Sequence, residues 1–131
     1  MSPDLKYLLF STILTFVQVL VAAMGANQAV GLNTLAGNRE GLGEIPGWAG
    51  RAKRAHLNMI ESMVVFAALV LTAVAAGKAN AVTAMGAMIF FWARVAYAVI
   101  YIAGIAWLRT LVWFVSVIGM AMIAWELLKA V

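Results

Sequence analysis

The stretch NAVTAMGAMIFFWARVAYAVIYIAGIAW, residues 80–107, contains a single charged residue, Arg94. It exceeds the roughly 20 residues that an α-helix needs to cross a hydrocarbon core about 30 Å thick. It is rich in Ala, Met and Ile and lacks the polar/apolar alternation of a transmembrane strand. Small residues such as Gly86 and Ala87 would let a neighbouring helix approach closely. We therefore expect a membrane-spanning helix over about 80–107.

Three other apolar segments, at about 5–31, 48–76 and 109–130, are also long enough to cross a bilayer. A Gly-rich polar loop of about 32–47 follows the first of them. Hydrophobic residues make up 66% of the 131-residue chain and charged residues only 11%, too few to cover a soluble domain. No stretch resembles a linker between folded units. We predict one all-α membrane domain over residues 1–131, folded as a four-transmembrane-helix bundle.

The net charge of +4 comes from basic residues near the ends of the apolar segments, where they would meet lipid headgroups rather than nucleic acid. One face has Arg39, Arg51, Lys53, Arg54 and Arg109, and the other has Lys6, Lys78 and Lys129. The larger set predicts that the first loop faces the cytosol and both termini lie away from it, in an inner membrane. The chain has no cysteine, which excludes disulfides and thiolate metal sites.

Polar side chains recur inside the second and third segments. At about 100° per residue, those of each segment share one helix face. The second segment has Arg54, Asn58 and Glu61, and the third has Arg94, Tyr97 and Tyr101. Ionisable residues inside a membrane segment are costly and usually point to a partner or a cavity. The two faces together predict a polar stripe that lines a binding cavity.

Depth in the membrane supports this pairing of the two helices. We take Trp48 and Trp107 as markers of the same interface on two antiparallel helices, each residue advancing about 1.5 Å. The residues then match level by level, Arg54 with Tyr101, Asn58 with Tyr97, and Glu61 with Arg94. The deepest pair has a second interpretation, since a buried ion pair would fix the helix register. The tyrosines, likewise, would serve in ordinary packing.

His56 is the only histidine of the chain. At about 100° per residue it lies about 200° from Arg54, on the opposite side of the second segment. We therefore expect His56 to be a headgroup-level or interhelical residue and leave it out of the stripe.

Two motifs carry a resemblance to a known family. RAHLNMIE at 54–61 is similar to the RAxxNxxE run of the MAPEG family, the membrane-associated proteins of eicosanoid and glutathione metabolism, and RVAYAVIY at 94–101 is similar to its RxxYxxxY run. Asn38-Arg39-Glu40 resembles the family's Asn-Pro-Glu, and Arg109 follows the second motif at about the family's distance. The resemblance covers nearly the whole chain, which looks like a bacterial-type member.

The resemblance implies a homotrimer that holds glutathione between protomers near the cytosolic side. On the family's pattern Arg54 would contact a glutathione carboxylate, Asn58 and Glu61 would hold its γ-glutamyl end, and Arg109 would sit by the sulfur. Arg94, Tyr97 and Tyr101 would belong to the same site. Some members have arginine where Leu57 stands, and some have serine and tyrosine where Thr110 and Trp113 stand.

The residue types suit this ligand. Glutathione has two carboxylates and an ammonium group, which arginine and carboxylate side chains bind. Arg109 at a helix N-terminus would lower the pKa of a bound thiol, and stabilising one such anion is worth one to a few kcal/mol, or roughly 10- to 1000-fold in rate. Lipophilic electrophiles would arrive from the bilayer.

Three functions follow from these features. The first is a glutathione transferase or peroxidase-type enzyme with glutathione as co-substrate. The second is a non-catalytic lipid-binding or scaffolding member of the same family. The third is a small multidrug exporter, which fits less well because the essential membrane glutamate of those proteins lies in the first helix, whereas the first segment here has only Asp4 at its start.

Overall fold

The computed structural model describes residues 1–131, and all of its regular structure is helical. The helices are α1 (Pro3–Val30), α2 (Leu32–Ala36), α3 (Gly47–Ala75), α4 (Ala81–Ala103) and α5 (Ala106–Leu128). All except the short α2 are long and apolar enough to cross a membrane. The predicted all-α fold with four membrane-spanning helices is therefore confirmed.

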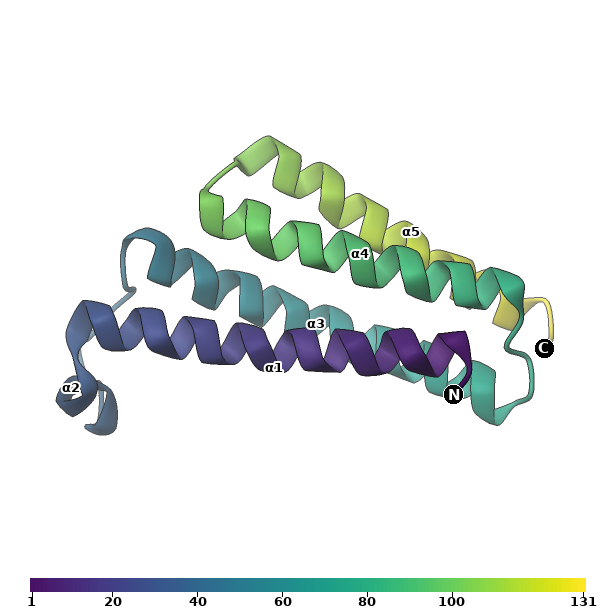
Figure 1. The fold of residues 1–131 in the computed structure, drawn as a ribbon, viewed down its shortest axis with the longest axis horizontal. Helices are drawn as coiled ribbons and strands as arrows, with labels where there is room; N and C mark the ends of the chain where they lie inside the picture. The colour runs from purple at the N-terminus through teal and green to yellow at the C-terminus, as the bar shows by residue number, and fades with distance from the viewer.

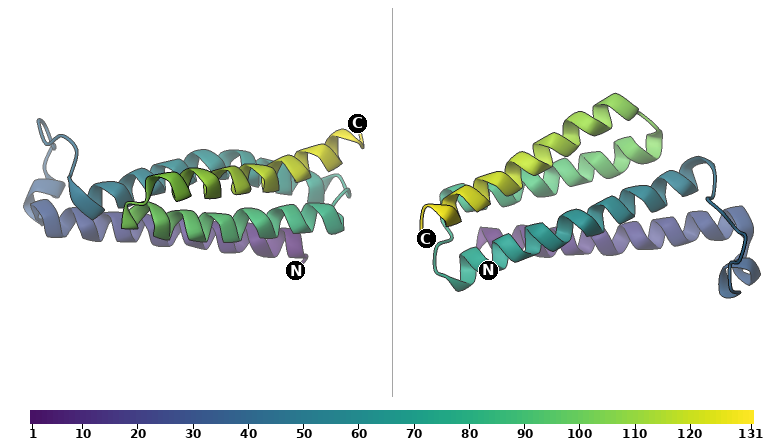
Figure 2. Two further views of the ribbon diagram at one scale, coloured as in Figure 1. Left: turned by 90° about the horizontal axis from the view of Figure 1, so that it is seen from above. Right: turned by 180° about the vertical axis from the view of Figure 1, so that it is seen from behind.

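The four long helices form two antiparallel pairs, α1 with α3 and α4 with α5 (Figure 1). Both chain termini and the α3–α4 connection lie at one end of the bundle, which we call the terminal end. The short α2 and the α4–α5 turn lie at the other, the loop end. The α4–α5 pair diverges from the α1–α3 pair toward the loop end (Figures 1 and 2). The bundle is therefore widest where the predicted polar stripe ends.

Aromatic side chains join the two helix pairs. Phe66 of α3 and Phe90 of α4 are fully buried, and their rings stack with centroids 3.9 Å apart. On α1, the rings of Tyr7 and Phe10 contact Phe91 of α4 at centroid distances of 5.9 and 5.6 Å. Such contacts stabilise a bundle through dispersion and close packing, because lipid leaves little hydrophobic driving force between helices.

Two glycines allow α4 and α5 to touch along their backbones. A Cβ atom placed on Gly86 of α4 would lie 2.5 Å from the carbonyl oxygen of Gly119 on α5. A Cβ atom on Gly119 would lie 2.6 Å from the carbonyl oxygen of Gly86. No other residue type fits at either position without moving the helices apart.

The α4–α5 turn lies earlier in the chain than predicted. The third segment was expected to continue to about 107, but α4 ends at Ala103 because Gly104 adopts the left-handed conformation with φ 86°. The N–H of Gly104 donates to the carbonyl oxygens of Ile100 and Tyr101 and closes the helix. Since α5 begins at Ala106, Trp107 belongs to α5 rather than to the end of the third segment. Apolar residues continue through the turn, so hydropathy does not reveal it.

The loop expected at about 32–47 contains the short helix α2, which the sequence analysis did not predict. After α2 the side chain of Arg39 turns back, and its Nε donates to the carbonyl oxygen of Leu35 at 2.8 Å. Arg39 has a φ of 61°. The proline of the family's Asn-Pro-Glu cannot adopt that angle, so the backbone here departs from the motif that Asn38-Arg39-Glu40 resembles.

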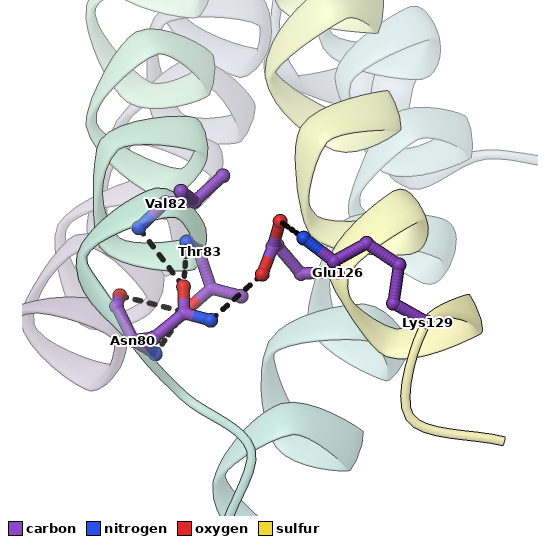
Figure 3. A network of polar contacts seen from close by, with 5 residues as sticks. All are labelled: Asn80, Val82, Thr83, Glu126 and Lys129. Atoms are coloured by element: carbon purple, nitrogen blue, oxygen red, sulfur yellow. Dashed lines mark hydrogen bonds and ion pairs between the residues drawn. The ribbon is translucent and has the colours of Figure 1, made fainter.

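A polar network ties the terminal end together (Figure 3). Asn80 precedes α4, and its side-chain oxygen accepts from the N–H groups of Val82 and Thr83 at 2.9 and 3.0 Å. Its Nδ2 donates to Glu126 of α5 at 2.8 Å, and the same carboxylate pairs with Lys129 at 2.8 Å. Asn80 therefore caps α4 and joins it to α5.

Replacing this cap should destabilise the protein. We expect Asn80→Ala to cost about 1–2 kcal/mol, because α4 loses its N-terminal hydrogen bonds together with the bond to Glu126. Thermal unfolding of the purified protein measures the effect. Lys129→Ala is the control, since it keeps the cap and breaks only the ion pair, and it should change the melting temperature little. An unchanged melting temperature in Asn80→Ala would mean that the cap contributes nothing to stability.

Candidate functional site

The shallowest pair of the predicted stripe is in contact. The Nε of Arg54 on α3 donates to the hydroxyl oxygen of Tyr101 on α4 at 3.3 Å. Arg54 also lies 3.8 Å from the carboxylate of Glu44 in the loop, but both side chains are exposed, so this ion pair contributes little. Arg54 and Tyr101 therefore lie at the same depth on neighbouring helices, as the sequence predicted.

Arg94 lies behind the stripe rather than on its surface. Its side chain is 1% exposed, and its Nη2 donates to the side-chain oxygen of Asn58 on α3 at 2.8 Å. Its guanidinium carbon lies 4.1 Å from the centre of the Tyr97 ring, within cation–π range. Arg94 therefore supports Asn58 and Tyr97 from inside the bundle. It was predicted as a binding residue, and at this exposure its side chain offers almost no surface to a ligand in the single chain.

A hollow of about 210 Å³ opens beside these residues, between α3, α4 and α5. Three predicted site residues line it, Asn58, Tyr97 and Arg109, and two residues not assigned to the site join them, Thr110 and Trp113. Two of the positions where the chain departs from some family members are therefore in the wall of this hollow.

Tyr101 brings two arginines together at the loop end. The guanidinium of Arg109, in the first turn of α5, lies 4.4 Å from the centre of the Tyr101 ring, whose hydroxyl accepts from Arg54. The rings of Tyr97 and Tyr101 meet edge to face at a centroid distance of 5.5 Å. The result is a basic site with tyrosine walls, in which both arginines contact one tyrosine.

Glu61 is the one predicted site residue that makes no side-chain hydrogen bond, ion pair or cation–π contact with the others. Its side chain is exposed on α3 and forms no ion pair. The alternative interpretation of Glu61 and Arg94 as a buried ion pair is therefore wrong for this structure, because the Arg94 side chain extends toward Asn58 instead. Glu61 remains available on the face of α3 that has Asn58.

Arg51 has a role that the sequence analysis did not assign. It was counted as an interfacial charge, but its Nε donates to the carbonyl oxygen of Ile102 in α4 at 2.9 Å. Its side chain also packs against Gly104, 3.5 Å from the position that a Cβ atom would take. Arg51 thus joins α3 to the α4–α5 turn, which precedes Arg109 in the chain. Its position one turn before Arg54 gave no signal of this contact.

A buried and mostly polar row of residues on α1 was not predicted from the sequence. Its members recur every seven residues and are Asp4, Ser11, Gln18 and Gly25. Oxygen atoms of the first three are buried and have no hydrogen-bond partner within the chain. The seven-residue spacing was visible in the sequence, and polar residues within an apolar helix are themselves a signal.

His56 lies on the α1 side of α3, away from the stripe, as predicted. Together with Arg39, Lys53 and Leu57 it lines a separate hollow of about 400 Å³ formed with α1 and the loop. Leu57, where some family members have arginine, thus faces a different surface from Asn58. The two sides of α3 therefore carry two chemically different surfaces.

The fold and the site together define an all-α membrane protein with four spanning helices and a basic, tyrosine-walled hollow at one end. The model of the MAPEG family matches residues 6–129, so the chain belongs to the MAPEG family. The resemblance carried by the two arginine motifs is thereby confirmed. No curated protein and no solved structure matches the chain.

Proposed function

We propose that this protein is a membrane-bound glutathione transferase or peroxidase-type protein, which activates the thiolate of glutathione against lipophilic electrophiles. The observation that carries the proposal is that Arg54 and Arg109 both contact Tyr101, next to a hollow lined by Asn58, Tyr97 and Arg109. Family membership supports it, because the family includes glutathione transferases and peroxidases as well as non-catalytic members.

The donors at the loop end suit the groups of glutathione. A guanidinium binds a carboxylate through paired hydrogen bonds, and the two arginines supply two such groups. Asn58 offers an amide for the peptide bonds, and the exposed carboxylate of Glu61 offers a partner for the ammonium group. The tyrosine hydroxyls add further donors. The arrangement matches the ligand in charge.

The hollow of one chain is small for this ligand. Its volume of about 210 Å³ lies below the roughly 300–1,000 Å³ typical of sites for drug-sized molecules. In our proposal a neighbouring protomer of a homotrimer closes the site, the loop end faces the cytosol of the inner membrane, and both termini lie on the other side. The electrophile reaches the sulfur from the bilayer.

The reaction needs only a thiolate and an electrophile held together. For an aryl chloride, the thiol proton leaves to solvent, the sulfur forms a bond to the ring carbon, and the carbon–chlorine bond breaks to release chloride. Arg109 stabilises the thiolate through its charge and through its place in the first turn of α5, where the helix dipole is positive. Glutathione-dependent conjugation of a chloronitrobenzene by the purified protein tests the activity.

A non-catalytic lipid-binding member is the second candidate. The hollow on the α1 side of α3 favours it, because that hollow combines apolar walls with the exposed cations Arg39 and Lys53. If it is correct, lipid raises the melting temperature of the protein and glutathione does not. The opposite result supports the transferase.

Calorimetry of glutathione binding tests the assigned residues. We expect Arg54→Ala to weaken binding by about 10- to 100-fold, since a charge-assisted hydrogen bond is worth about 1.5–3 kcal/mol. Lys53→Ala is the matched control, because Lys53 is the adjacent cation but lines the opposite hollow. It should leave the affinity unchanged. A normal affinity in Arg54→Ala would place the carboxylate contact elsewhere.

A further inference from the structure

The buried guanidinium of Arg94 is only partly hydrogen-bonded within the chain. One of its nitrogens, Nη2, donates to Asn58, but Nε and Nη1 are buried and have no partner within the chain. No carboxylate pairs with the guanidinium. A buried cation with two unpartnered nitrogen donors is costly in an apolar medium, so partners for these donors are needed.

The buried row on α1 passes Arg94 at the right depth. Tyr7 and Phe10 contact Phe91, and α1 runs parallel to α4. The Arg94 guanidinium lies over the ring of Tyr97, which is six residues after Phe91 on α4. Six residues after Tyr7 and Phe10 on α1 are residues 13 and 16, which therefore lie at about the same depth. The guanidinium is therefore at a depth between Ser11 and Gln18, each within about one helical turn, or about 5.4 Å.

A second contact gives the same depth independently. Gly25 of α1 packs against Trp48 and Ala49 of α3, which is antiparallel to it. Counting from this contact to Asn58, the acceptor of Nη2, reaches about residue 15 or 16 of α1. Counts from contacts near both ends of the bundle thus give the same level of α1 for the guanidinium, at about residues 13–16.

The unpartnered atoms on the two helices complement each other. Arg94 has two free donors, whereas Ser11 Oγ and Gln18 Oε1 are acceptors without partners, on residues 0% and 5% exposed. No direct hydrogen bond joins them. Water accepts from one group and donates to another, and it bridges buried polar groups of this kind in proteins.

We propose that Ser11, Gln18 and Arg94 form an internal binding site for water between α1 and α4, and that the bridging water holds the guanidinium that orients Asn58. Ser11 and Gln18 are then positioning residues. Because Asn58 and Tyr97 both line the hollow and both contact Arg94, α1 supports the candidate site without touching it.

A melting-temperature cycle tests the water site. We expect Gln18→Leu to lower the melting temperature by about 3–6 °C in the wild-type background and by less than about 1 °C in Arg94→Met. Gln28→Leu is the matched control, an exposed glutamine on the same helix, and should have no effect. An equal fall in both backgrounds would show that Gln18 only packs, and would overturn the proposal.

A second variant needs no change at Arg94. Gln18→Glu would bring a carboxylate to the guanidinium through the same water, so at neutral pH we expect it to melt above Gln18→Leu, which brings no polar group. A melting temperature below that of Gln18→Leu would contradict the proposal, because a buried carboxylate that meets no cation costs more than an apolar side chain.

Glutathione affinity should also fall in Gln18→Leu if Gln18 positions the site, whereas a purely structural role would leave it unchanged. This measurement is the only one here that rests on the proposed function. In Gln18→Leu we expect affinity to fall about five- to tenfold, with Gln28→Leu unchanged. Absence of binding in the wild-type protein would remove the proposed function but leave the melting-temperature cycle to decide the water site. Normal affinity in Gln18→Leu would remove the positioning role.

Discussion

Arg109→Ala is expected to lower kcat/KM for glutathione conjugation by roughly 10- to 1000-fold, with a smaller effect on glutathione affinity. Arg109 lines the hollow from the first turn of α5, and its contact with Tyr101 holds the guanidinium in place. A free thiol has a pKa of about 8.5, so little thiolate is present at neutral pH. A fixed cation raises the thiolate fraction.

The pH dependence separates this effect from a loss of folding. Without Arg109 the apparent pKa of the bound thiol should rise toward its free value, so the loss in rate should be largest at low pH and should shrink as pH rises above that value. Lys53→Ala removes a cation from the same end of the bundle but from the other side of α3, and its rate should match the wild-type rate. A rate for Arg109→Ala that equals wild type at every pH would exclude Arg109 from catalysis.

Gly119→Ala should give the largest loss of stability. Its new Cβ atom would lie 2.6 Å from the carbonyl oxygen of Gly86 and 2.9 Å from the backbone nitrogen of Phe90. Because these neighbours are backbone atoms, the two helices must separate, and we expect a loss of about 2–3 kcal/mol. Thermal unfolding in detergent measures it.

Gly37→Ala is the matched control for this substitution. Gly37 has a φ of −78°, which alanine also adopts, and a Cβ atom there would lie 3.6 Å from its nearest neighbours, an ordinary contact. The melting temperature of this variant should equal that of the wild type. If Gly119→Ala melted at the same temperature as Gly37→Ala, the close contact between α4 and α5 would not stabilise the fold.

Sequence patterns predicted the features that depend on a single helix. Length and hydropathy located the four spans, and angular spacing placed Asn58 and Arg54 on one face and His56 on the other. The pairing of Arg54 with Tyr101 also followed, although the marker Trp107 used for it lies beyond the turn, on α5. The family motifs predicted the family itself. The structural inferences among these need only the constant rotation and rise per residue of an α-helix.

Features that depend on side-chain direction or on backbone turns could not be predicted in this way. Arg94 has a long side chain, which here extends to Asn58 instead of the Glu61 at its own depth. Gly104 ends α4 within an apolar run that contains no other stop signal. The contact of Arg51 with Ile102 requires knowing where that turn lies. Gly86 was expected to allow close packing, but nothing in the sequence identified Gly119 as its partner.

Three arginines join α3 to α4 in the loop half of the bundle, and each donates to a neutral acceptor. Arg51 donates to a backbone carbonyl, Arg54 to a phenol and Arg94 to an amide. Hydrogen bonds of this kind connect the helices without neutralising the cations, so the electric field of Arg51 and Arg54 persists at the loop end, apart from the loose contact of Arg54 with Glu44. Such a field raises the local concentration of anions and speeds their association, and added salt screens it. The bonds that hold these helices together thus also create a long-range attraction for negatively charged molecules.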